Sequence, residues 1–159
     1  MKKKIFAVLA LAILLALSMA PAAWAATVAS GDCGAQGDNV TWVLDDTGTL
    51  TISGTGAMKD FSVRDNESSI HLLPAPWRSD GKNIKILNIT IQNGVTSLGD
   101  NAFSNCFNAV SISIPDSITR IGHHTFFDCR SLTSIELPEN ITFIDSFAFN
   151  KCTNLLQIT

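Results

Sequence analysis

Residues 94–106 read GVTSLGDNAFSNC, and near copies follow at residues 117–129 (SITRIGHHTFFDC) and 140–152 (NITFIDSFAFNKC). Each copy begins 23 residues after the one before it. The same step separates three cysteines, three phenylalanines and two prolines, namely Cys106, Cys129, Cys152, Phe103, Phe126, Phe149, Pro115 and Pro138. A fixed period in the twenties is typical of a solenoid, in which each unit buries its apolar edge against the next. We therefore expect this stretch to decide the fold.

Each unit of the repeat contains the pattern of two short strands and a turn. The triplets Ile89-Thr90-Ile91, Ile112-Ser113-Ile114 and Ile135-Glu136-Leu137 predict a strand whose outer residues point inward and whose middle residue points outward. After this strand, each unit has two apolar residues three positions apart, and this spacing predicts a second extended segment. Residues 100–106 and their copies predict a single helical or 3₁₀ turn. The fold class expected is a β-rich solenoid of 23-residue leucine-rich coils, with short strands and short helical or 3₁₀ turns.

Residues 26–85 have a different pattern, which predicts a small β cap. Residues 40–44 (VTWVL) and 50–53 (LTIS) have β-type composition, and residues 45–48 (DDTG) form a turn signal between them. This predicts a hairpin in which Trp42 faces inward. Residues 74–77 (PAPW) predict a rigid extended segment that carries a large aromatic side chain. A module in this place can cover the apolar end of the first repeat.

Residues 1–25 have the pattern of a secretory signal peptide. Three lysines precede an apolar run at residues 5–19, and Ala23-Trp24-Ala25 has the form of a cleavage site. A retained N-terminal anchor is the alternative. Cleavage removes three lysines and no acidic residue, which leaves 134 residues with 8 basic and 14 acidic side chains and a formal charge of −6. Nucleic acid and anionic lipid are poor partners for such a chain, because both are recognised first through clustered lysine and arginine.

Four cysteines remain after cleavage, and an even number in an exported protein suggests disulfides. Three of them, Cys106, Cys129 and Cys152, share one phase of the repeat and would form a ladder. A recurring structural phase favours small buried apolar groups, as free cysteines are. A bridge between neighbouring rungs stays open as the alternative, and Cys33 has no partner that the sequence can assign.

Residues 86–159 are expected to form three coils and an incomplete fourth. The sequence stops at residues 157–159, within the fourth strand, where an open strand edge would follow. We expect either a fragment of a longer array or an end covered by self-association, and we favour the fragment.

The repeat resembles the BspA-type leucine-rich repeat family. The family's pattern per coil is met by residues Leu132, Ile135, Leu137, Pro138, Ile141, Ile144, Ala148, Phe149 and Cys152. Residues 30–34 (SGDCG), 48–58 (GTLTISGTGAM) and 76–77 (PW) resemble the segment that precedes such arrays in many bacterial members. Departures include Asp145 in place of glycine and Thr125 in place of alanine.

The resemblance implies a secreted or cell-surface bacterial protein without catalytic residues. Several family members are adhesins that bind host matrix proteins or other cells, so we expect a protein-binding, adhesin-like module without a cofactor. The alternative is a structural spacer or stalk within a longer surface protein. An enzyme has no supporting constellation of residues in this sequence.

No cluster of side chains predicts a metal site. His123 and His124 are adjacent, lie at a variable phase, and are expected in a solvated turn. The candidate protein-binding surface instead combines the outward strand residues with three phenylalanines at variable phases: Thr90, Ser113, Glu136, Phe107, Phe127 and Phe143. For the phenylalanines, packing over loops or against further coils stays open as the alternative.

Overall fold

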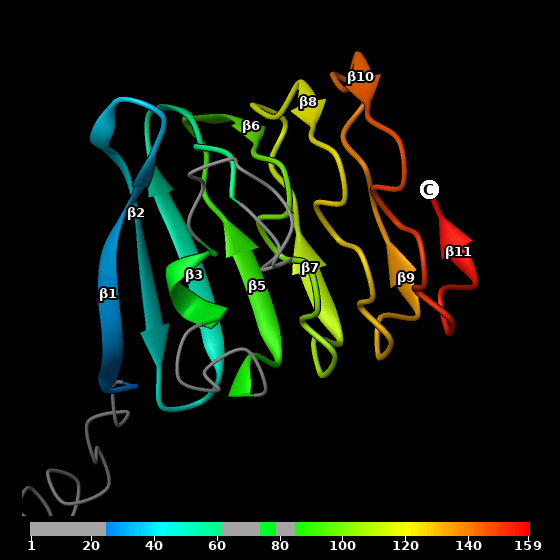
Figure 1. Ribbon diagram of the computed structural model, residues 1–159, viewed down its shortest axis with the longest axis horizontal. Coiled ribbons are helices and arrows are strands. Elements are labelled where there is room, and N and C mark those ends of the chain that lie inside the picture. The colour runs from blue at the N-terminus through cyan, green and yellow to red at the C-terminus, as the bar shows by residue number, and fades with distance from the viewer. Residues whose placement is uncertain (1–24, 62–73, 79–84) are drawn as a thin grey trace, which may run out of the picture.

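The structure is a computed structural model that describes residues 25–61, 74–78 and 85–159. The expected signal peptide therefore lies outside the described residues, apart from Ala25. Figure 1 shows strands side by side from β1 at one end to β11 at the other, which confirms that the chain is β-rich. The strands are β1 (Thr27–Gly34), β2 (Gly37–Asp45), β3 (Thr49–Gly54), β4 (Gly56–Ala57), β5 (Asn88–Ile91), β6 (Val95–Leu98), β7 (Ser111–Ser113), β8 (Arg120–Ile121), β9 (Ser134–Ile135), β10 (Phe143–Ile144) and β11 (Gln157–Ile158).

The largest sheet has five strands in the order β1-β2-β3-β5-β7. The expected hairpin is present as β2 and β3, which pair antiparallel with Leu44 opposite Leu50. Trp42 is buried, as the sequence predicts. Strand β1 pairs antiparallel with β2 and was not expected from the sequence. Strand β3 pairs in parallel with β5, so the N-terminal hairpin continues directly into the repeats (Figure 1). The domain boundary expected after residue 85 falls between β4 and β5 and stays a prediction.

The later strands pair in parallel on two sides of the molecule. Strands β4, β6, β8 and β10 form a second sheet, and β9 pairs with β11. From β5 onward, the paired residues of neighbouring strands are 23 positions apart, as residue 88 is from residue 111 and residue 120 from residue 143. The pairs that show this offset are Asn88 with Ser111, Ser97 with Arg120, Arg120 with Phe143, and Ser134 with Gln157.

A column of stacked aromatic rings runs through the core between the sheets. Trp77 stacks on Phe103 at a centroid distance of 5.7 Å, Phe103 on Phe126 at 5.6 Å, and Phe126 on Phe149 at 5.3 Å. Trp77, Phe103 and Phe126 are fully buried, and Trp42 packs its edge against Trp77. Trp77 therefore begins, from the N-terminal part of the chain, a stack that the repeats continue.

Trp77 is carried by a short 3₁₀ turn at residues 76–78, so the rigid extended segment expected there is wrong for these residues. The turn buries the indole, and its Nε1–H donates to the carbonyl of Ala102 at 2.9 Å. Burying this ring without a partner for its N–H would be costly, and this hydrogen bond removes that cost.

Residues 100–106 and their copies form turns, and the expected helical or 3₁₀ turn is wrong. Neither helix type uses positive φ, which the backbone adopts here at two recurring phases. The six residues, with φ between 54° and 61°, are Asn101, His124 and Phe147 at the first phase and Asn105, Asp128 and Lys151 at the second.

The turns are not helical because many of their backbone N–H groups donate to carbonyls of a neighbouring copy. Alternate N–H groups of the first two turns donate to the next copy, as Phe103 does to Thr125 at 2.8 Å and Phe126 to Ala148 at 2.9 Å. A helix would direct these N–H groups to carbonyls of its own segment. The left-handed residues let alternate amides face the neighbouring copy, so the turns are joined across copies as the strands are.

We predict that Phe126→Ala destabilises the protein by about 3–5 kcal/mol, because it removes a buried ring from the middle of the aromatic column. The matched control is Phe143→Ala, where the ring is 46% exposed and the loss should stay below about 1 kcal/mol. Urea unfolding followed by circular dichroism measures both. Similar losses for the two variants would contradict the assigned core.

We also predict that Lys151→Asn is more stable than Lys151→Ala by about 1 kcal/mol, because asparagine tolerates left-handed backbone better than alanine does. Both variants lose the ammonium group that lies over Phe127, so their difference isolates the backbone effect. Thermal unfolding measures the difference. Equal stability would show that residue 151 is not left-handed.

Candidate functional site

The outward strand positions of the sheet form one continuous face. Thr90 is half-buried on β5, Ser113 is exposed on β7, and Glu136 is exposed directly after β9. Their apolar neighbours in the strands, such as Ile89 and Ile135, are buried in the core. The alternation of the sequence therefore places these three candidate residues on the solvent side, as expected.

The strand ladder is interrupted on this face between β7 and β9. Leu87 N–H donates to Gly48 at 2.8 Å, and Val110 N–H donates to Leu87 at 2.9 Å. The corresponding bond from Thr133 to Val110 is absent among the described residues, although Leu156 donates to Thr133 at 2.9 Å. Strands β7 and β9 accordingly belong to different sheets. Two neighbouring copies are thus not joined by backbone bonds at this one position of the face.

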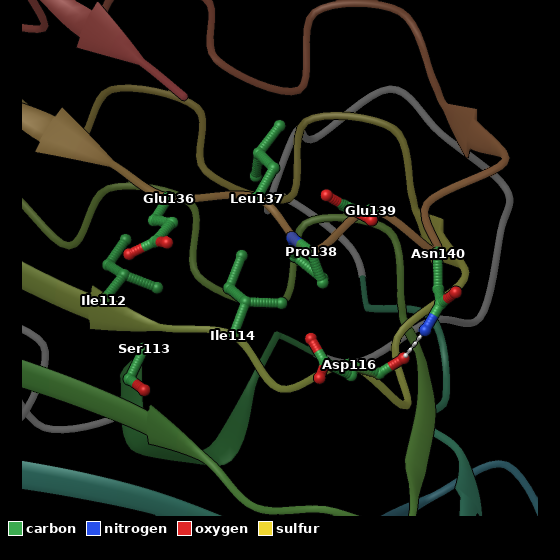
Figure 2. Close-up of a pocket in the computed structure, with 9 residues that line it drawn as sticks. All are labelled: Ile112, Ser113, Ile114, Asp116, Glu136, Leu137, Pro138, Glu139 and Asn140. Atoms are coloured by element: carbon green, nitrogen blue, oxygen red, sulfur yellow. Dashed lines mark hydrogen bonds between the residues drawn. The ribbon is translucent and has the colours of Figure 1, made fainter.

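A groove of about 570 Å³ lies at this interruption (Figure 2). Four apolar side chains contribute to it from the two copies: Ile112, Ile114, Leu137 and Pro138. The polar residues that line it are Ser113, Asp116, Glu136, Glu139 and Asn140. The groove therefore brings together two of the predicted site residues, Ser113 and Glu136. The other four do not line it.

The polar lining is acidic, and the described residues place no lysine or arginine in it. The carboxylates of Asp116, Glu136 and Glu139 form no ion pair within the described residues, whereas Asp145 pairs with Arg120 at 3.2 Å. Figure 2 shows one hydrogen bond across the groove wall, which Asn140 Nδ2 donates to the backbone carbonyl of Asp116 at 3.0 Å. This bond joins the loops that follow β7 and β9.

Sequence reasoning missed Asp116, Glu139 and Asn140. A signal was present, because residues 116 and 139 are 23 apart and each directly follows the repeated proline. Two acids at one phase of neighbouring copies predict a local concentration of negative charge. The groove itself could not be predicted, because it depends on a backbone bond that is missing between copies.

The three candidate phenylalanines lie elsewhere, and each carries a cation from its own chain. Arg130 lies over Phe107 with 5.0 Å from guanidinium carbon to ring centroid, and Arg120 lies over Phe143 at 4.5 Å. Lys151 Nζ lies 5.1 Å from the centroid of Phe127. Phe107 and Phe127 are half-buried, whereas Phe143 is 46% exposed. These contacts support packing between copies, so the phenylalanines stay a weaker part of the predicted surface.

His123 and His124 lie with their ring centroids 3.9 Å apart, beside Phe127 and Phe147. His123 Nδ1 is 3.0 Å from the hydroxyl of Ser146. Burial and the neighbouring His123 lower the pKa of His124, while Asp100 opposes this shift. Within the residues that the structure describes, no group of three or more histidine, cysteine or acidic side chains is arranged to hold a metal ion.

The four cysteines are free thiols in the structure. Cys129 Sγ donates to Phe103 O at 3.4 Å, and Cys152 Sγ donates to Phe126 O at 3.1 Å. Burial raises the pKa of Cys33 and of Cys106 to about 12. The neighbouring Cys152 and burial raise the pKa of Cys129, whereas the neighbouring Cys129 lowers the pKa of Cys152. Cys152, which is half-buried, is therefore the reactive thiol of the ladder.

Residues 82–159 match the family model described as BspA type leucine rich repeat region, with six copies. The repeat region belongs to the BspA-type leucine-rich repeat family. Proteins of this family are generally without enzymatic activity, and membership indicates a protein-interaction module. A search of the curated proteins found no match. No helix among the described residues is long and apolar enough to cross a membrane.

Solved structures of bacterial leucine-rich repeat proteins resemble this chain. A leucine-rich repeat protein from Eubacterium ventriosum shares 24% sequence identity over 82% of this chain, with a TM-score of 0.53, and shows the same fold. A leucine rich cell surface protein from Faecalibacterium prausnitzii shares 18% identity over 76% of this chain, with a TM-score of 0.43. The chain spans 44% of the former protein and 52% of the latter.

We predict that Cys152 is alkylated first when the folded protein is treated with iodoacetamide at pH 8, because it combines access with a lowered pKa. Mass spectrometry of peptides from timed samples identifies the modified residue. Cys152→Ser should abolish the fast phase, and all four thiols should react after unfolding in urea. Fast labelling of Cys33 or Cys106 in the folded protein would contradict their burial.

Proposed function

We propose that this chain is a non-catalytic protein-binding module, exported to the cell surface or the medium, and that it acts as an adhesin-like section of a β-rich solenoid. The offset of 23 residues between paired strands supports 23-residue coils. The turns, which are also joined from copy to copy, support the same architecture. The apolar run and cleavage pattern of residues 1–25 support export.

The observation that carries the binding proposal is the groove at the ladder interruption. Ser113 and Glu136 lie on the outward face and line this groove together with apolar side chains from two copies. A regular strand face offers a partner protein side chains at constant spacing, and the groove adds a concave anchor point. The alternative of a spacer or stalk has no comparable observation in its favour.

We predict that Ser113→Trp weakens binding to a protein partner by at least about tenfold, because the indole fills the groove. The control is Thr96→Trp, an exposed strand residue on the other sheet. The test is biolayer interferometry of the exported chain against purified fibronectin, fibrinogen, laminin and collagen. Binding that both variants weaken equally, or no binding to any of the four proteins, would contradict the proposal as stated.

The oligomeric state is measured alongside by size-exclusion chromatography with light scattering, because self-association at the C-terminal edge is proposed as the alternative to a fragment of a longer array. Exposed apolar side chains gather in β10, β11 and the turn between them, which supports this proposal; they are Phe143, Ile144, Phe147, Leu156 and Ile158. A monomer at every concentration would overturn the self-association and leave the binding proposal in place.

A further inference from the structure

The groove has a shape and a charge that select one kind of side chain. Its apolar contribution comes from Ile112, Ile114, Leu137 and Pro138, and three carboxylates lie in its lining. Lysine and arginine combine an apolar stem of several methylene groups with a terminal positive charge. Such a side chain can bury its stem against Ile114 and Leu137, which are half-buried, and present its charge to the carboxylates.

In the part of the chain that the structure describes, no basic side chain lines the groove to supply this cation. Among the described residues, four basic side chains lie over aromatic rings at other places, Lys59, Arg120, Arg130 and Lys151. Arg78 donates to the hydroxyl of Ser104, and Lys85 lies beside the β2–β3 turn. The carboxylates of the groove therefore have no internal counter-charge in the part of the chain that is described.

We propose that the groove between β7 and β9 binds a lysine or arginine side chain of an extended, cationic segment of the partner protein. This inference rests on the proposed binding function and names the chemistry of its partner. The exposed carboxylates of Glu136 and Glu139 contact the charge, and the half-buried side chains of Ile114 and Leu137 contact the stem. Asn140 supports the wall: its Nδ2 is engaged by the carbonyl of Asp116, which leaves its Oδ1 as a further acceptor.

An extended segment suits the face because side chains alternate along a strand and recur on one side every two residues. The partner then places one cation in the groove, and its neighbours lie over the outward positions of β5 and β7. Association of this kind weakens as salt increases, because the carboxylates are exposed and screened.

The test uses two fluorescent seven-residue peptides, one of alternating arginine and serine and one in which citrulline replaces arginine. Citrulline has the same shape as arginine and no charge. Fluorescence anisotropy with the full exported chain measures binding at low and at physiological salt. We expect the arginine peptide to bind and the citrulline peptide to bind at least about fivefold more weakly.

Matched variants separate the groove from the general acidity of the protein. Glu136→Gln with Glu139→Gln removes two charges at the groove. Asp32→Asn with Asp38→Asn removes two exposed charges on β1 and β2. We expect the first pair to weaken binding of the arginine peptide by about threefold to tenfold and the second by less than twofold. Methyl signals of Ile112, Ile114 and Leu137 in NMR spectra should shift on titration with this peptide.

Equal weakening by the two variant pairs, or equal binding of the two peptides, would overturn the cation site. Absence of methyl shifts at the groove would do the same. A protein partner whose binding is lost in Ser113→Trp but unchanged in Glu136→Gln with Glu139→Gln would overturn this inference alone and leave the proposed function standing. If the chain binds none of the purified proteins but still binds the arginine peptide, the proposed function is overturned instead.

Discussion

The stacked aromatic column is the interaction on which the rest of the structure depends. Each ring lies between 5.3 and 5.7 Å from the next, close to the spacing of neighbouring strands. Rings at this separation bury Phe103 and Phe126 each between two neighbouring rings, while the strands and turns of the same copies exchange backbone hydrogen bonds. Trp77 gives the first ring of the column, so the N-terminal module and the repeats share one core.

Much of this arrangement could be predicted from the sequence, because it follows from the 23-residue repeat and from the alternation of apolar and polar residues in the strands. The recurrence of phenylalanine and cysteine gave the buried phases, and the alternation around Thr90 and Ser113 gave the outward face. Strand β1 was missed because its residues, TVASGDCG, show little apolar alternation and are held chiefly by pairing with β2. The left-handed turns were also missed, although Asn105 and Asp128 are residues that tolerate positive φ.

The candidate site depends on a feature that the 23-residue repeat does not predict, namely a missing backbone bond between two strands. Every copy repeats the strand residues, yet within the described residues the junction of β7 and β9 lacks a backbone bond that its neighbours on this face possess. The groove thus arises from a local departure from regularity, and the acids after each repeated proline give it a charge. The regular scaffold fixes the positions of these side chains, and the departure provides a concave place for a partner to contact.

Amide hydrogen exchange measured by NMR tests this account most directly. Two amides can be compared: Thr142 N–H donates to Thr119 O at 2.9 Å on one side, and Thr133 N–H has no equivalent bond to the described residues on the other. We expect the amide of Thr133 to exchange at least about tenfold faster than that of Thr142, because only the latter is held in a ladder. Equal protection of the two amides would mean that the ladder is continuous, and the groove would not exist.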